Sequence, residues 1–153
     1  PLSNVIAPLV DFALAFIVLL MMMAWYGVAP SPNIIFLPVL LAMTLALSLA
    51  IGLWLGPINV RFRDIVHTVP FLFQVWMYAT PIVYPLSMVP ERWRLLYSLN
   101  PMVGIIDGFR WALLGVGSVD FTALAISSVI IVIALISGLI FFRNAERRFA
   151  DVI

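Results

Sequence analysis

Between Asp11 and Arg61 the chain carries no charged residue, so residues 12–60 form one uncharged stretch. A helix needs about 20 apolar residues to cross roughly 30 Å of hydrocarbon, so this stretch is too long for one span. Of the 153 residues, 65% are hydrophobic and 10% are charged. Because soluble domains are roughly 45–50% apolar and about 25% charged, the composition predicts a protein of the lipid bilayer.

Charge and cysteine content exclude several classes of protein. The net charge is +1, and eight arginines with no lysine give no basic patch for a phosphate backbone, so we expect no nucleic-acid partner. With no cysteine there is no disulfide framework and no thiolate metal site. The chain begins at Pro1 without a basic segment followed by a cleavable apolar stretch, so we expect a truncated chain or a fragment and no visible signal peptide.

Prolines and charges divide the apolar sequence into four expected membrane spans. Pro30 and Pro32 separate the first two, and Gly56-Pro57 is expected to end the second. The third is the least regular because it contains several prolines. The expected spans are residues 9–28, 34–56, 66–88 and 120–142, with a water-facing loop at 57–65 and an amphipathic helical tail at 143–153.

Residues 89–119 are expected to form two short helices instead of a span. Pro90-Glu91 suits a helix start, and Asn100-Pro101 stops that helix and opens another. Asp107 and Arg110 in the second helix are three residues apart and can pair. Each helix is too short to cross, so we expect both to lie at the interface or to re-enter the membrane. An ordinary extramembrane hairpin is the alternative.

Arginine counts predict the orientation, since arginine and lysine favour the cytoplasm. The loop and tail carry five arginines and the opposite side carries three: Arg61, Arg63, Arg143, Arg147 and Arg148 against Arg92, Arg94 and Arg110. We therefore place the loop and the tail in the cytoplasm.

Small residues recur every four positions in two of the expected helical regions. Such rows let membrane helices approach closely. They leave two possibilities open, an interface between subunits or packing within one chain. The rows are Ser48, Gly52 and Gly56; Ala42, Ala46 and Ala50; and Gly104 and Gly108.

The third stretch is unusually aromatic and holds Phe71, Phe73, Trp76, Tyr78 and Tyr84. Aromatic faces can stack on sugar rings, and a proline-broken helix suits a pathway that must widen. Core or lipid-facing aromatics are the commoner arrangement. For catalysis the chain offers only His67 and no metal-ligand pair, nucleophile elbow or glycine-rich phosphate loop, so we expect neither an active site nor a metal.

A series of short motifs resembles the C-terminal part of type-2 ABC exporter permeases, especially those that export lipid-linked polysaccharides such as O-antigen, capsule or teichoic acid. The resemblance covers essentially the whole chain. In order, the motifs are Asn59-Val60-Arg61-Phe62-Arg63-Asp64, Pro70-Phe71, Gln74, Thr80-Pro81-Ile82-Val83-Tyr84-Pro85, Val89-Pro90, Leu99-Asn100-Pro101, Asp107-Gly108-Phe109-Arg110-Trp111 and Glu146-Arg147-Arg148-Phe149-Ala150-Asp151.

The resemblance implies an all-α membrane protein holding the last four spans of a six-span permease, with residues 89–119 as a pair of outer gate helices. It implies two permeases around a channel in the bacterial inner membrane, with ATP and Mg²⁺ bound in separate ATP-binding subunits and no cofactor in this chain. The implied channel-lining residues are Phe71, Trp76, Tyr78 and Tyr84; the implied gate residues are Asp107 and Arg110; and the charged loop suggests Arg61, Arg63 and Asp64 for coupling to the ATPase.

The expected function is therefore export of a lipid-linked glycan, driven by ATP hydrolysed in a partner subunit. A type-2 ABC exporter of drugs or lipids is the nearest alternative. A membrane enzyme of glycan assembly would need clustered acidic residues and a divalent metal at the membrane edge, and a purely structural anchor would have no ATPase partner.

Overall fold

The computed structural model describes the chain apart from residues 1–2, 63, 83, 85–87, 117–119 and 151–153. The described residues form helices and connecting segments and include no strand, in agreement with the expected all-α class. In chain order the elements are α1 (Ser3–Trp25), the 3₁₀ helix η1 (Pro32–Phe36), α2 (Leu37–Arg61), α3 (Ile65–Ala79), α4 (Glu91–Ser98), α5 (Pro101–Leu114) and α6 (Phe121–Ala150).

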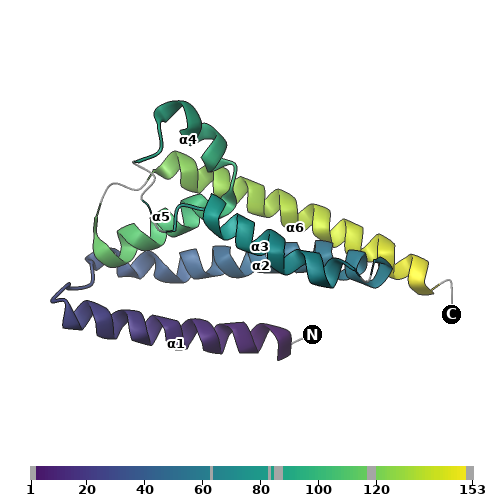
Figure 1. Cartoon of the computed structure of the whole chain (residues 1–153), viewed down its shortest axis with the longest axis horizontal. Coiled ribbons are helices and arrows are strands. Elements are labelled where there is room, and N and C mark those ends of the chain that lie inside the picture. Colours follow the sequence, from purple (N-terminus) through teal and green to yellow (C-terminus); the bar gives the residue numbers. More distant parts are fainter. Residues whose placement is uncertain (1–2, 63, 83, 85–87, 117–119, 151–153) are drawn as a thin grey trace.

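The long helices run back and forth along one axis (Figure 1). The end of α2, the beginning of α3 and the end of α6 lie at the right-hand end of that view. The connection from α1 to η1, together with α4 and α5, lies toward the opposite end. The segment around Arg61 and the arginines of α6 therefore share one end of the molecule.

The core is formed where α2, α5 and α6 meet. Leu47 of α2, Ile105 of α5 and Ile131 of α6 are buried together in one apolar cluster. Met43, Phe109 and Leu135 pack around them.

Glycines allow these three helices to approach one another closely. A Cβ on Gly104 would lie 2.8 Å from the carbonyl oxygen of Ala123, and one on Gly108 would lie 2.7 Å from Leu40. A Cβ on Gly138 would lie 3.1 Å from the Trp54 ring. The Gly104–Gly108 row therefore packs within the chain, whereas no neighbouring atom lies within 4 Å of a Cβ placed on Gly52.

Two stretches within the described residues are long and apolar enough to cross a membrane, Pro32–Arg61 and Phe121–Arg147, with mean hydropathies of 2.6 and 2.8. Only 17% of the residues in each apolar 18-residue segment are fully buried, and apolar side chains such as Val39 on α2 and Ile133 on α6 are exposed. The stretch Val10–Trp25 of α1 is also apolar apart from Asp11. An outward apolar surface on long helices suits contact with lipid rather than with water.

The expected break at Gly56-Pro57 is wrong, because α2 continues through Pro57 to Arg61. A proline within a membrane helix is tolerated where neighbouring helices support the freed backbone. Pro57 is buried, and the Trp54 ring just before it stacks on Phe141 of α6 with ring centroids 4.8 Å apart. Contact with α6 thus reaches Trp54 and Gly56, directly before Pro57, and the connection to α3 is shorter than the expected loop 57–65.

The expected span at residues 66–88 is not one helix. α3 contains Pro70 and ends at Ala79, before the buried Pro81. Its 15 residues extend about 22 Å, less than the roughly 30 Å of hydrocarbon. Pro85 lies outside the described residues.

The expected separate tail helix at 143–153 is also corrected. Arg143 and Arg147 lie on α6, which continues without a break to Ala150. The sequence between Phe121 and Ala150 contains no proline and only one glycine, so nothing local ends the helix at Phe142.

Candidate functional site

Asn100 caps the beginning of α5. Its side-chain Oδ1 accepts a hydrogen bond from the backbone N–H of Met102 at 3.1 Å, and Pro101 occupies the first helical position. Both features are typical of a helix N-terminus. At the other end Gly115 has a φ of +64°, and its N–H donates to Trp111 O at 3.0 Å. The start expected at Asn100-Pro101 is confirmed.

The same Asn100 side chain also binds the end of α3. Its Oδ1 accepts a second hydrogen bond from Trp76 Nε1 at 3.1 Å, and its Nδ2 donates to Thr80 Oγ1 at 2.9 Å. Thr80 Oγ1 in turn donates to the carbonyl oxygen of Trp76 at 2.8 Å. One asparagine therefore uses its acceptor oxygen and its amide to join two helices while capping one of them.

Arg110, near the end of α5, forms a second attachment to the chain that follows α3. Its guanidinium donates to the carbonyl oxygen of Ile82 at 3.1 Å and to that of Pro81 at 3.5 Å. Arg110 Nη1 also lies 3.9 Å from Asp107 Oδ1, and both side chains are about one-quarter exposed. The expected pairing of Asp107 with Arg110 is confirmed. The carbonyl contacts show in addition that Arg110 attaches the segment after α3 to α5.

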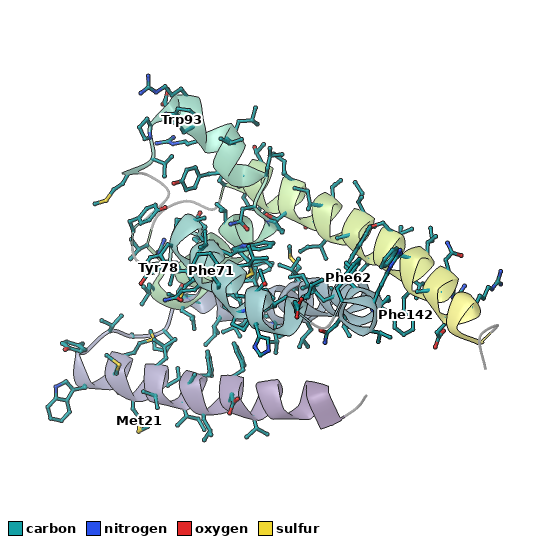
Figure 2. The ribbon with its side chains drawn as sticks, turned by 45° about the vertical axis from the view of Figure 1, so that its right-hand side comes forward. Met21, Phe62, Phe71, Tyr78, Trp93 and Phe142 are labelled. Atoms are coloured by element: carbon teal, nitrogen blue, oxygen red, sulfur yellow. The ribbon has the colours of Figure 1, made fainter. Side chains whose placement is uncertain are left out.

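The four candidate channel residues lie in two different settings. Phe71 and Tyr78 are 64% and 68% exposed on α3, and Figure 2 labels both. Trp76 is less exposed and makes the hydrogen bond to Asn100. Tyr84 lies beyond the end of α3, and its hydroxyl lies 3.2 Å from that of Tyr97 on α4. The structure therefore does not bring the four rings into one cluster.

Tyr84 and Tyr97 belong to a separate aromatic pocket of about 370 Å³ between α4 and the segment before it. Trp93, also labelled in Figure 2, and Pro90 contribute to the same walls. The pocket combines aromatic faces with two phenol hydroxyls. Such a surface can make both stacking contacts and hydrogen bonds.

The candidate coupling residues lie at the opposite end of the molecule. The Arg61 guanidinium lies 5.4 Å from the centre of the Phe62 ring, a cation–π distance. Asp64 occupies the N-cap position of α3 and makes no side-chain cap hydrogen bond. Arg63 lies outside the described residues. Arg61 and Asp64 line an open cavity of about 610 Å³ between α2 and α3, which gives this end a recess with charges at its mouth.

Nothing in the described part of the chain suggests a metal centre, since it contains no group of three or more His, Cys, Asp or Glu side chains placed to hold an ion. His67 is exposed on α3. The polar groups that do cluster are amides, hydroxyls and guanidinium groups, which hold helices together.

Comparison with known proteins decides the family. The model of the ABC-2 type transporter family matches residues 2–114, which is more than half of the chain. The chain belongs to the ABC-2 type transporter family. The match includes α1 to α5 and therefore the whole polar network around Asn100 and Arg110.

Relatives of this ABC-2 chain are transport permeases. The O-antigen export system permease protein RfbA of Myxococcus xanthus is 35% identical over 112 residues, covering 72% of this chain and 43% of the relative. A protein of the same name from Klebsiella pneumoniae is 25% identical over the entire chain and 59% of its own length. The inner membrane transport permease YadH of Escherichia coli K12 is 33% identical over 56% of this chain. The chain thus spans about half the length of the O-antigen permeases it matches.

Reading the sequence missed two partnerships in this ABC-2 chain. Asn100 was identified only as a helix boundary, although Trp76 and Thr80, 24 and 20 residues before it, complete its hydrogen bonds. Arg110 was matched only with Asp107, although the Ile82 carbonyl is its nearer partner. The available signal was an asparagine in an apolar segment, since a side-chain amide away from water requires partners.

Proposed function

We propose that this chain is part of the membrane permease of an ATP-driven exporter that moves lipid-linked polysaccharide across the bacterial inner membrane. The supporting observation is that relatives named O-antigen export permeases align with it, one of them over the entire chain. In this proposal two permease copies enclose the channel. ATP and Mg²⁺ bind to separate ATP-binding subunits, which is the usual arrangement in this family.

In this proposal the glycan passes the exposed aromatic face of α3. Phe71, Trp76 and Tyr78 present rings that can stack on sugars, and Tyr84 adds a phenol beyond the end of that helix. Asp107 and Arg110 fix the segment after α3 against the outer helices. Arg61, Arg63 and Asp64 receive the movement of the ATP-binding subunits.

Export of a drug or a lipid is the second candidate, because the transport permease YadH, whose name specifies no cargo, is 33% identical over 85 residues. The test is deletion of the gene in the organism that carries it, followed by complementation with the full-length gene. Loss of surface polysaccharide with lipid-linked glycan accumulating inside supports glycan export. Normal surface polysaccharide overturns it, and greater sensitivity to an expelled compound then favours the second candidate.

Coupling to the ATPase is tested by reversing charge beside α3. In the full-length permease, Arg63→Glu combined with Asp64→Arg should lower export by about fivefold or more, because this change alters the charged surface offered to the partner. Glu91→Arg is the matched control, since Glu91 is an exposed acid on α4 at the opposite end. Export and ATP hydrolysis are measured in membrane vesicles. Unchanged export in the double variant contradicts this role.

A further inference from the structure

α3 is attached to its neighbours in two unequal ways. Along its side facing α2 it is separated by open cavities, whereas at its end it is hydrogen-bonded to α5. Figure 1 shows α3 lying over α2 and ending beside α5. This asymmetry determines which of its contacts can change at low cost.

The contact between α3 and α2 is open along most of its length. A cavity of about 480 Å³ lies between Leu55 of α2 and Trp76 of α3, and almost all of its lining is apolar. The cavity of about 610 Å³ continues beside it toward the Arg61 end, and Leu55 and Leu72 line both. A gap of this size has few dispersion contacts across it, so α3 can move relative to α2 without breaking close packing.

The contact between α3 and α5 is made by polar side chains, and two of its residues, Trp76 and Asn100, also line the cavity of about 480 Å³. Asn100 accepts from Trp76, donates to Thr80 and caps α5, so a shift of α3 relative to α5 would break both of its hydrogen bonds to the end of α3. Arg110 holds the next two carbonyls of the chain, those of Pro81 and Ile82. Where water is scarce, such bonds are costly to leave unmade, because the freed groups find no replacement partners.

We propose that α3 and α5 move as one body during transport, with Asn100 as the residue that joins them, and that this body shifts against α2. The inference rests on the proposed export function. It adds a path from the Asp64 end of α3 to α5. A movement of the start of α3 is carried along a helix of 15 residues to Trp76 and Thr80 and then through Asn100 to α5.

The first experiment measures distances in the full-length permease assembled with its ATP-binding partner. Spin labels replace exposed residues, Met77 on α3, Leu114 on α5 and Leu49 on α2. Between the nucleotide-free and the vanadate-trapped states, the distance from Met77 to Leu114 should stay constant and that from Met77 to Leu49 should change. A change between Met77 and Leu114, or constancy of both distances, overturns the proposal.

The second experiment removes the joining residue. Asn100→Ala should lower export by about fivefold or more while ATP hydrolysis continues, and should broaden the distance distribution between Met77 and Leu114. Asn144→Ala, at an exposed asparagine on α6, is the matched control. Asn100→Asp keeps the acceptor for Trp76 and Met102 but loses the donor to Thr80, so its effect should be intermediate.

A merely structural role for Asn100 predicts a different result. In that case export and ATP hydrolysis would fall together with the amount of folded protein, and the label distances in the surviving protein would be unchanged. That outcome overturns the proposal. Absence of glycan export by the unmodified protein would instead refute the proposed function, while the distance measurements, which need only the ATPase, would still test the joint movement.

Discussion

The packed helices α2, α5 and α6 differ from the outlying helices α1 and α3 in one simple respect. The closest contacts among the packed helices are made at glycines of α5 and α6, whereas the sequences of α1 and α3 contain no glycine. Gly104, Gly108 and Gly138 lie where another helix passes within contact distance. In contrast, Phe71, Tyr78 and most of the apolar side chains of α1 are exposed, and Met21 points away from the other helices (Figure 2).

The comparison teaches that apolar composition makes helices suited to a membrane but does not determine which helices pack against each other. Lipid is as apolar as leucine, so helices associate where small residues allow close backbone approach or where polar groups bond across the contact. The contacts among α2, α5 and α6 form where small residues allow close backbone approach. The contact of α3 with α5 instead forms through polar groups, namely Asn100 and its hydrogen-bond partners.

The largest effect is expected from filling a close contact. Gly104→Ala should destabilise the protein by about 2–3 kcal/mol, because the new Cβ would meet Ser127 Oγ and the backbone oxygen of Ala123, and backbone cannot easily yield. Unfolding in detergent by chemical denaturation measures the loss. Gly52→Ala is the matched control, since nothing lies within 4 Å of its Cβ position. Equal losses of unfolding free energy for both variants would contradict the difference in packing between Gly104 and Gly52.

A smaller loss of stability is expected from a large-to-small substitution in the core. Ile105→Ala should lower the free energy of unfolding by about 2 kcal/mol through the cavity it leaves. This is at the low end for such substitutions, because an isoleucine side chain loses little when it faces lipid instead of the protein core. Ile105 is 1% exposed, whereas Ile17 on α1 is 51% exposed. Ile17→Ala should therefore cost much less in the same unfolding measurement. A loss at Ile17 that matched the loss at Ile105 would show α1 to be packed as tightly as α5.

The polar attachment after α3 can be tested by a double-mutant cycle. Asp107→Ala and Arg110→Ala should each reduce export, and the two effects should fail to add by about 0.5 kcal/mol or more, because the side chains lie 3.9 Å apart. Export rates of the wild type, both single variants and the double variant supply the four corners. Arg110→Ala should have the larger effect, since it also releases Pro81 and Ile82. Strictly additive effects would show that Asp107 and Arg110 act independently in export.

The smallest effect is expected at a buried hydroxyl. Ser127 Oγ is fully buried without a hydrogen-bond partner, so Ser127→Ala should change stability by less than about 0.5 kcal/mol or increase it slightly. The neighbouring Ser128 Oγ donates to Leu124 O at 2.8 Å and serves as the control. Unfolding of Ser127→Ala and Ser128→Ala in detergent compares them. A loss above about 1 kcal/mol at Ser127 would indicate that its hydroxyl forms a hydrogen bond in the folded protein, and would contradict the expectation.

Local signals were sufficient to predict where α4 and α5 begin. Pro90-Glu91 and Asn100-Pro101 begin α4 and α5 as expected, because helix starts depend on residues within one turn. The pairing of Asp107 with Arg110 follows from spacing on one helix. The break at Pro57 failed because contacts with α6, more than 80 residues later, support the helix there.

By itself the sequence determined that this chain is helical and apolar enough for a bilayer, where α4 and α5 begin and which family it resembles. Those properties depend on composition and on neighbours a few residues apart. The tertiary structure decided which glycines pack against another helix, that Gly52 meets no neighbour and lines open space beside α3, and that α3 is bound to α5 by Asn100 while cavities separate it from α2. These contacts join residues far apart in the sequence. In a uniformly apolar chain, only the folded arrangement of its few small and polar residues distinguishes one partner from another.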